Sequence, residues 1–158
     1  MLPNNMLAMP KTPKRRGEWA ELQFMARAAS YDLKLCRPWG ESSRYDVTVE
    51  HATGFHRVQV KATSHSQRHM WRCCLPRQAY TAGDFDYLAV YIIPEDMWYI
   101  LPFAAIGGRT SIALHGLRRA KGKYQQYIEA WHLLGKSPYP AHTAGVLDSK
   151  CDEGGAAT

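Results

Sequence analysis

The sequence predicts an α/β or α+β domain built around one β-sheet. Three observations support this: a helical apolar pattern near the N-terminus, a run of strand-like segments in the middle, and a second helical pattern near residue 130. A chain of 158 residues is long enough for one domain with a single core. We therefore expect one folded domain over residues 17–135.

The first element is a helix over residues 17–30. Its apolar residues recur at helical spacing: Trp19, Leu22, Met25, Ala26 and Ala29. Strands then follow at 33–38, at 44–50 and 55–62 around the connection HATG, at 69–76, at 86–93 and at 95–102. The near-continuous apolar run 86–93 predicts a central, buried strand.

The last element is predicted as a helix in AKGKYQQYIEAWHLLG, residues 120–135. Its apolar stripe consists of Tyr124, Tyr127, Ile128, Trp131 and Leu134, and Gly135 ends it. Residues 136–158, rich in Gly, Ala, Pro and Ser, predict a disordered tail. Residues 1–16 predict a flexible basic arm, in which Arg15 and Arg16 are candidate phosphate contacts, although an ordinary solvated terminus fits as well.

Charge and cysteine usage indicate the setting in which the protein works. The formal net charge of +6 favours a polyanionic partner such as nucleic acid. Four cysteines, two of them adjacent, form no disulfide framework, so we expect a reducing, cytoplasmic location. No apolar run reaches the ~18 residues of a membrane span, and we expect no membrane partner.

The hairpin RYDVTVEHATGFHRVQVKATS, residues 44–64, carries the most informative polar pattern. Side chains alternate along a strand, so burying the valines of both strands on one face places Asp46, Gln59 and Lys61 together on the other. A tight connection sets Asp46 directly opposite Gln59, and a slip by two residues leaves them diagonal neighbours. A carboxylate, an amide and an ammonium group then converge, which suits metal-dependent phosphodiester hydrolysis. The local pattern alone favours an ordinary solvated face with a surface ion pair.

In that chemistry each group of the hairpin has an expected role. Asp46 is the anionic Mg²⁺ ligand, while Gln59 and the Val60 backbone carbonyl supply further oxygen ligands. Lys61 orients or helps to deprotonate the attacking water and offsets transition-state charge.

Two further groups of side chains lie close to the hairpin in sequence. His65, His69, Cys73 and Cys74 raise the alternative of a zinc site, but a strand here would turn the two cysteines to opposite faces. Cationic side chains that we expect to contact DNA phosphates are Arg44, Arg68, Arg72 and Arg77, with a solvated edge as the alternative.

An ordered series of motifs resembles the PD-(D/E)XK nuclease superfamily over about residues 16–135. The motifs are Glu21 in GEWAELQF, Asp46 in SSRYDVTV and Gln59-Val60-Lys61 in HRVQVKA, followed by FDYLAVY, MWYILP and KYQQYIEAW. The bacterial branch with a Gln-x-Lys third motif is the most similar; it includes a homing endonuclease from a cyanobacterial group I intron. Holliday-junction resolvases are more distant.

The resemblance implies a restriction-endonuclease-like α/β fold, a mixed central β-sheet flanked by helices. It also implies a Mg²⁺-dependent DNA endonuclease, in which Mn²⁺ can replace Mg²⁺, with Glu21 completing the ligands; Glu18, three residues earlier, is the alternative. Cutting two strands calls for two sites, so we expect a homodimer or homotetramer. Two other hypotheses stay open: a non-catalytic DNA-binding module with this fold, and an interaction protein whose charge keeps it soluble.

Overall fold

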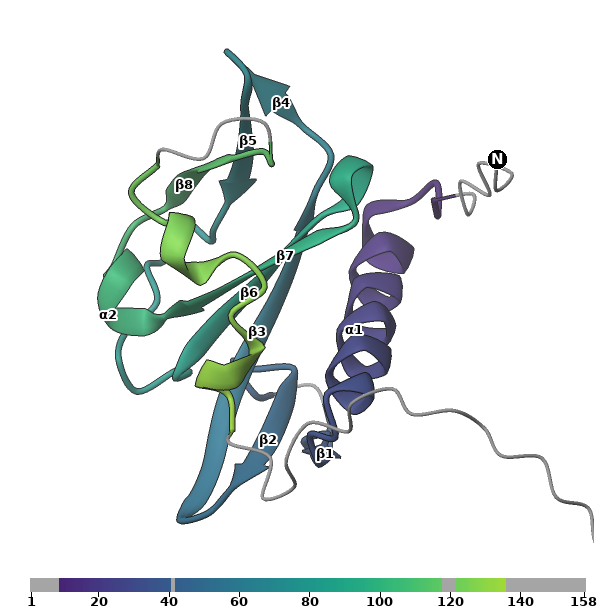
Figure 1. Cartoon of the computed structure of the whole chain (residues 1–158), viewed down its shortest axis with the longest axis vertical. Helices are drawn as coiled ribbons and strands as arrows, with labels where there is room; N and C mark the ends of the chain where they lie inside the picture. The colour runs from purple at the N-terminus through teal and green to yellow at the C-terminus, as the bar shows by residue number, and fades with distance from the viewer. Residues whose placement is uncertain (1–8, 41, 118–121, 136–158) are drawn as a thin grey trace, which may run out of the picture.

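A computed structural model describes residues 9–40, 42–117 and 122–135. Its centre is a mixed five-stranded sheet in the order β1-β2-β3-β6-β7 (Figure 1). The strands are β1 (Leu35–Cys36), β2 (Val47–His51), β3 (Gly54–Thr63), β6 (Tyr87–Ile92) and β7 (Met97–Pro102). Only the β3–β6 pair is parallel in the described sheet. The predicted mixed central sheet is confirmed, and β6 lies inside it, with five of its six residues buried.

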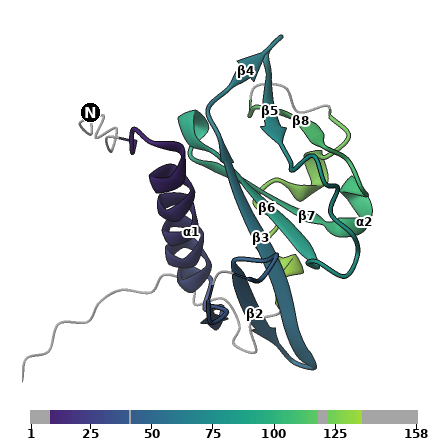
Figure 2. The same ribbon diagram turned by 180° about the vertical axis from the view of Figure 1, so that it is seen from behind.

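One face of this sheet is covered by α1 (Pro13–Ser30) (Figures 1 and 2). Thr12 caps the helix by accepting a hydrogen bond from the Arg15 N–H, and Pro13 opens its first turn. The buried positions are Ala20, Phe24 and Ala28, spaced four residues apart. The predicted apolar stripe is therefore wrong at Leu22, Ala26 and Ala29, all of which are exposed, Leu22 at 56%.

The opposite face carries a small second sheet and a short helix (Figure 2). Its elements are β4 (Ser66–Gln67), β5 (Met70–Cys74), β8 (Ser111–His115) and α2 (Phe103–Ile106). Leu88, Val90 and Ile92 of β6 pack on this side, whereas Ala89 and Tyr91 pack with α1. The alternation of a strand thus divides the core into two layers. β8 and α2 were not predicted.

The predicted closing helix over 120–135 is wrong in the part that the structure describes. Two single turns of 3₁₀-helix, Gln125–Tyr127 and Trp131–Leu133, stand in its place. Between them the chain is extended at Ile128, which bridges to Tyr99 of β7, and Glu129 has a left-handed φ of 47°.

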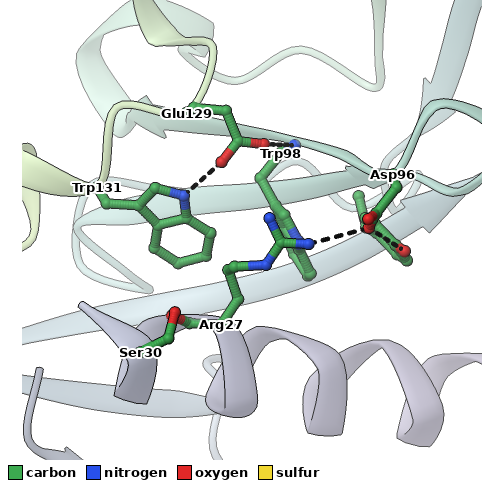
Figure 3. Close-up of polar contacts among 7 residues, drawn as sticks. Arg27, Ser30, Asp96, Trp98, Glu129 and Trp131 are labelled. Atoms are coloured by element: carbon green, nitrogen blue, oxygen red, sulfur yellow. Dashed lines mark hydrogen bonds and ion pairs between the residues drawn. The ribbon is translucent and has the colours of Figure 1, made fainter. Parts of the chain in front are cut away.

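Hydrogen bonds that Glu129 accepts and donates explain why this segment is not an α-helix (Figure 3). The Trp98 N–H and the Trp131 Nε1–H donate to its two carboxylate oxygens, each at 2.7 Å, and the Glu129 N–H donates to the Trp98 carbonyl at 2.8 Å. The segment is thus held to the edge of β7. Tertiary contacts override the local helical periodicity.

The boundaries proposed for the domain are only partly visible. Residues 13–16, predicted as part of the basic arm, form the first turn of α1. Residues 1–8 of the arm and the predicted tail at 136–158 lie outside the described residues. Within the described part of the chain, no helix combines the length and the apolar character that crossing a membrane requires.

Candidate active site

The β2–β3 hairpin has the register that the sequence predicts. Val47 pairs with Val58 and His51 with Gly54, so the same register places Asp46 opposite Gln59. Val58 and Val60 pack toward α1. Gln59 and Lys61 therefore project from the other face of β3.

Asp46 lies at the point where β2 begins, and its carboxylate is bound to the neighbouring strand. The Val60 N–H donates to Asp46 Oδ2 at 2.7 Å, and the Gln59 amide nitrogen donates to the same oxygen at 2.5 Å. The N–H and C=O of one residue in a strand point to the same side, so the Val60 carbonyl faces Asp46 as well. The Gln59 amide nitrogen lies 3.3 Å from that carbonyl oxygen.

Glu21 approaches this edge from α1. Its side chain is 20% exposed, and Arg37, which follows β1, donates a hydrogen bond of 2.9 Å to Glu21 Oε2. Burial raises the pKa of the Glu21 carboxyl, and the nearby Asp46 charge raises it further. Burial also raises the pKa of Asp46, while Lys61 opposes the shift at both carboxyls. Three groups from α1, the start of β2 and β3 are therefore electrostatically coupled.

These groups line one pocket of about 460 Å³ between the first half of α1, the open edge of β3 and β5. Predicted site residues at its wall are Glu21, Asp46, Gln59, Val60, Lys61, Arg16 and Arg72. The structure therefore brings together all of the predicted metal and catalytic residues. His65 and Cys74 also line the pocket.

The other predicted DNA contacts lie elsewhere. Arg15 lines a separate shallow cavity with Lys11 and Thr12. Arg44 forms an ion pair of 3.3 Å with Asp84, and its guanidinium lies over the Tyr80 ring, 5.2 Å from the centroid. Arg68 is exposed at the turn between β4 and β5.

The oxygen atoms of the pocket fit a hard divalent cation. Two carboxylates and a backbone carbonyl are ligands that Mg²⁺ accepts, with water and phosphate filling the other positions. The mutual repulsion of Asp46 and Glu21 is a second indication, because a bound cation would relieve it.

The zinc alternative does not fit. The described residues contain no cluster of three or more His, Cys, Asp or Glu side chains that could hold a metal. Cys73 is buried and Cys74 exposed, on opposite faces of β5 as the sequence predicts. Burial raises the pKa of the Cys73 thiol to about 12, so it is no ready thiolate ligand.

Comparison with known proteins places the chain in a family. The family model described as PD-(D/E)XK endonuclease matches residues 11–134, a range that contains every residue lining the pocket. The chain belongs to the PD-(D/E)XK endonuclease family. It is thus a member of a nuclease family, as the resemblance implied.

Two solved structures are similar to this chain. The bacterial homing endonuclease I-Ssp6803I is similar with a TM-score of 0.66 and 27% identity, over 77% of this chain and 90% of that one. The Holliday junction resolvase Hjc of the archaeal hyperthermophile Archaeoglobus fulgidus has a TM-score of 0.45 and 13% identity, over 62% and 84%. No curated protein sequence gives a match. The predicted restriction-endonuclease-like fold is confirmed.

One residue of this candidate site was missed by sequence reasoning. Arg37 neutralises Glu21, although nothing in its local pattern distinguishes it from a solvated arginine. Its position directly after a short strand, 16 residues from Glu21, gives no periodic signal. Only the packing of α1 beside β1 brings the two together.

Proposed function

We propose that the protein is a divalent-metal-dependent endonuclease that hydrolyses phosphodiester bonds in DNA. The observation that carries the proposal is the convergence of Glu21, Asp46, the Val60 carbonyl and Lys61 on one pocket. Membership of the PD-(D/E)XK family and the likeness to a homing endonuclease support DNA as the substrate.

Each group in the pocket has a role in the proposed reaction. Asp46, Glu21 and the Val60 carbonyl hold the ion, Mg²⁺ or Mn²⁺, and Gln59 assists once its amide turns its oxygen inward. A bound ion polarises the phosphoryl oxygen and makes a bound water more acidic. Lys61 orients the attacking water, helps to remove its proton and offsets the negative charge that develops on the phosphate.

Cations that line the pocket support binding of the DNA backbone. Arg16 and Arg72 line the wall, and α1 opens without any acidic residue in its first turn. The partial positive charge of a helix N-terminus adds to Lys14, Arg15 and Arg16 there. This end of α1 therefore attracts phosphate. A double-strand cut requires two such sites, so we propose a homodimer or homotetramer.

The location that we propose is the cytoplasm. Cys36, Cys73 and Cys74 are all free thiols, which supports a reducing compartment.

A second candidate function is a non-catalytic DNA-binding module. The observation that favours it is the Gln59 amide nitrogen, which already hydrogen-bonds Asp46 and the Val60 carbonyl. Because these oxygen atoms already accept hydrogen bonds from Gln59, the folded site needs no cation to stabilise it. Gln59 also brings no charge of its own to a metal.

Incubation of the purified protein with plasmid and branched DNA, with Mg²⁺, Mn²⁺ or chelator, separates the two. We expect nicking or linearisation with either ion, reduced at least about 100-fold in Lys61→Ala and Asp46→Ala. Lys34→Ala, at an exposed lysine outside the pocket, is the matched control. DNA binding that persists in chelator, with no cleavage under any divalent ion, would select the binding module.

A further inference from the structure

Trp39 is the feature of the molecule that packing leaves unexplained. Its side chain is 99% exposed, whereas the other exposed large apolar side chains of the described chain lie between 46% and 60%. Trp98 and Trp131 are 1% and 2% exposed. A tryptophan in water forgoes the large apolar burial that the side chain offers.

The backbone around Trp39 holds the indole outward. Pro38 has a fixed φ, and Gly40 adopts a φ of 79°, so a tight bend follows the tryptophan. Arg37 anchors the segment on one side by its 2.9 Å hydrogen bond to Glu21, and Arg44 anchors it on the other through Asp84 and Tyr80. The described arginines on either side of Trp39 in the sequence are thus both bound to the rest of the fold.

Those anchors place Trp39 beside the candidate active site. Its Cα lies within about 7 Å of the Arg37 Cα, because two extended residues span no more than that. The Arg37 guanidinium in turn donates to Glu21 Oε2 at 2.9 Å, so two residues and one arginine side chain separate Trp39 from the pocket. DNA that continues past a phosphate at Glu21 and Asp46 on this side would meet the indole.

The charge around the tryptophan indicates nucleic acid rather than protein. Arg37 and Arg44 flank it, and Arg16, Lys61 and Arg72 line the adjoining pocket. No other large apolar side chain lies in the described residues between 37 and 44. An exposed aromatic side chain flanked along the chain by two arginines suits base stacking beside a phosphate backbone.

We propose that Trp39 contacts the bases of DNA next to the cleaved phosphate, by stacking on an unpaired base or by inserting between base pairs. The proposal rests on the proposed function, because it requires DNA in the pocket. It adds a base-contacting residue to a site whose other contacts are to phosphate. A wedge of this kind favours flexible or branched DNA, in which unstacking costs least.

Binding to labelled duplex and branched DNA, measured by fluorescence anisotropy in chelator, tests the proposal without cleavage. We expect Trp39→Ala to weaken binding by about 5- to 150-fold and Trp39→Phe to retain most of it. The slope of log K against log salt should stay unchanged in Trp39→Ala, whereas Arg72→Ala should reduce it by about 1. Phe55→Ala, at a 58% exposed aromatic near the far end of the hairpin, is the matched control and should bind normally.

A second measurement follows the indole directly. Iodide quenching of wild-type fluorescence minus that of Trp39→Phe reports on Trp39, and DNA should protect it. If Trp39→Ala bound DNA as tightly as wild type, or if bound DNA did not protect the indole from iodide, the role of Trp39 would be overturned and the proposed function would stand. A change in oligomeric state in Trp39→Ala, seen by light scattering, would overturn it in favour of a subunit contact. Wild-type protein that binds no DNA would overturn the proposed function as well.

Discussion

Gln59 and Asp46 face each other at the start of β2, and the Gln59 amide nitrogen donates a 2.5 Å hydrogen bond to Asp46 Oδ2. The same nitrogen lies 3.3 Å from the Val60 carbonyl oxygen. A neutral donor therefore links two of the proposed metal ligands. An acidic side chain at this position cannot donate those bonds. The amide thus stabilises the metal-free site, while it withholds a negative charge from the ion.

Gln59→Glu tests whether the amide stabilises the metal-free site at the expense of metal affinity. Without metal, the new carboxylate lies against Asp46 and leaves the Val60 carbonyl without its donor, so we expect the free energy of unfolding to fall by roughly 1–3 kcal/mol. With Mg²⁺, the added charge should lower the concentration needed for half-maximal stabilisation by about tenfold. Thermal melts in chelator and across a Mg²⁺ titration measure both effects.

Gln126→Glu is the matched control, because it makes the same chemical change at an exposed position. It should alter neither the melting temperature in chelator nor the response to Mg²⁺. If Gln59→Glu showed the same Mg²⁺ midpoint as wild type, Gln59 would not lie among the metal ligands.

The Asp46 carboxyl should oppose folding at neutral pH. Burial raises its pKa, so the folded state binds a proton more tightly than the unfolded state does. The free energy of unfolding therefore falls as the pH rises through the folded-state pKa of Asp46, where the buried carboxyl must give up its proton. This destabilisation is absent below the unfolded-state value of about 3.9.

Asp46→Asn removes this charge and keeps an oxygen that can accept from the Val60 N–H. We expect the variant to melt a few degrees above wild type at pH 7 in chelator, with the difference shrinking toward pH 4. Mg²⁺ should stabilise wild type only. Calorimetry across this pH range measures both melting temperatures. An Asp46→Asn variant that is less stable than wild type at pH 7 would mean that the Asp46 charge does not oppose folding.

Arg37 and the proposed metal compete for Glu21. The guanidinium is 59% exposed and donates a 2.9 Å hydrogen bond to Glu21 Oε2. Arg37→Ala should therefore tighten Mn²⁺ binding several-fold, because a cation beside the site is removed. Metal-dependent shifts of the melting temperature provide the measurement, with Arg109→Ala at an exposed arginine as the control. Weaker Mn²⁺ binding would instead mean that Arg37 positions Glu21 for the ion.

The hairpin could be predicted from sequence because its register depends on local rules. Alternation has a period of two, and a tight connection leaves one register that buries Val47 and Val58 together. The same rules bring Asp46 opposite Gln59. The Arg37–Glu21 pair obeys no such rule, since it arises from the packing of α1 against the strand that follows it. Trp39 was missed for a related reason, because exposure is a property of the whole fold.

The C-terminal part of the domain shows where periodicity fails. Tyr124, Tyr127, Ile128 and Trp131 recur at helical spacing, but they pack against different parts of the sheet. A backbone bridge from Ile128 to Tyr99 and the left-handed Glu129 replace the helical hydrogen bonds. β8, which pairs with β5, was also missed.

Glu129 should be the residue that holds this segment on β7. Glu129→Ala removes the acceptor for the Trp98 N–H and the Trp131 indole, and leaves the buried main-chain donor without a partner (Figure 3). We expect a loss of about 2–4 kcal/mol in the free energy of unfolding, measured by urea denaturation. Glu129→Gln should lose about half as much, because its amide keeps one acceptor oxygen. Glu18→Ala, at an exposed carboxylate on α1, should change stability by less than about 0.5 kcal/mol. Equal stability of Glu129→Ala and Glu18→Ala would mean that the apolar contacts of Trp131 alone hold the segment in place.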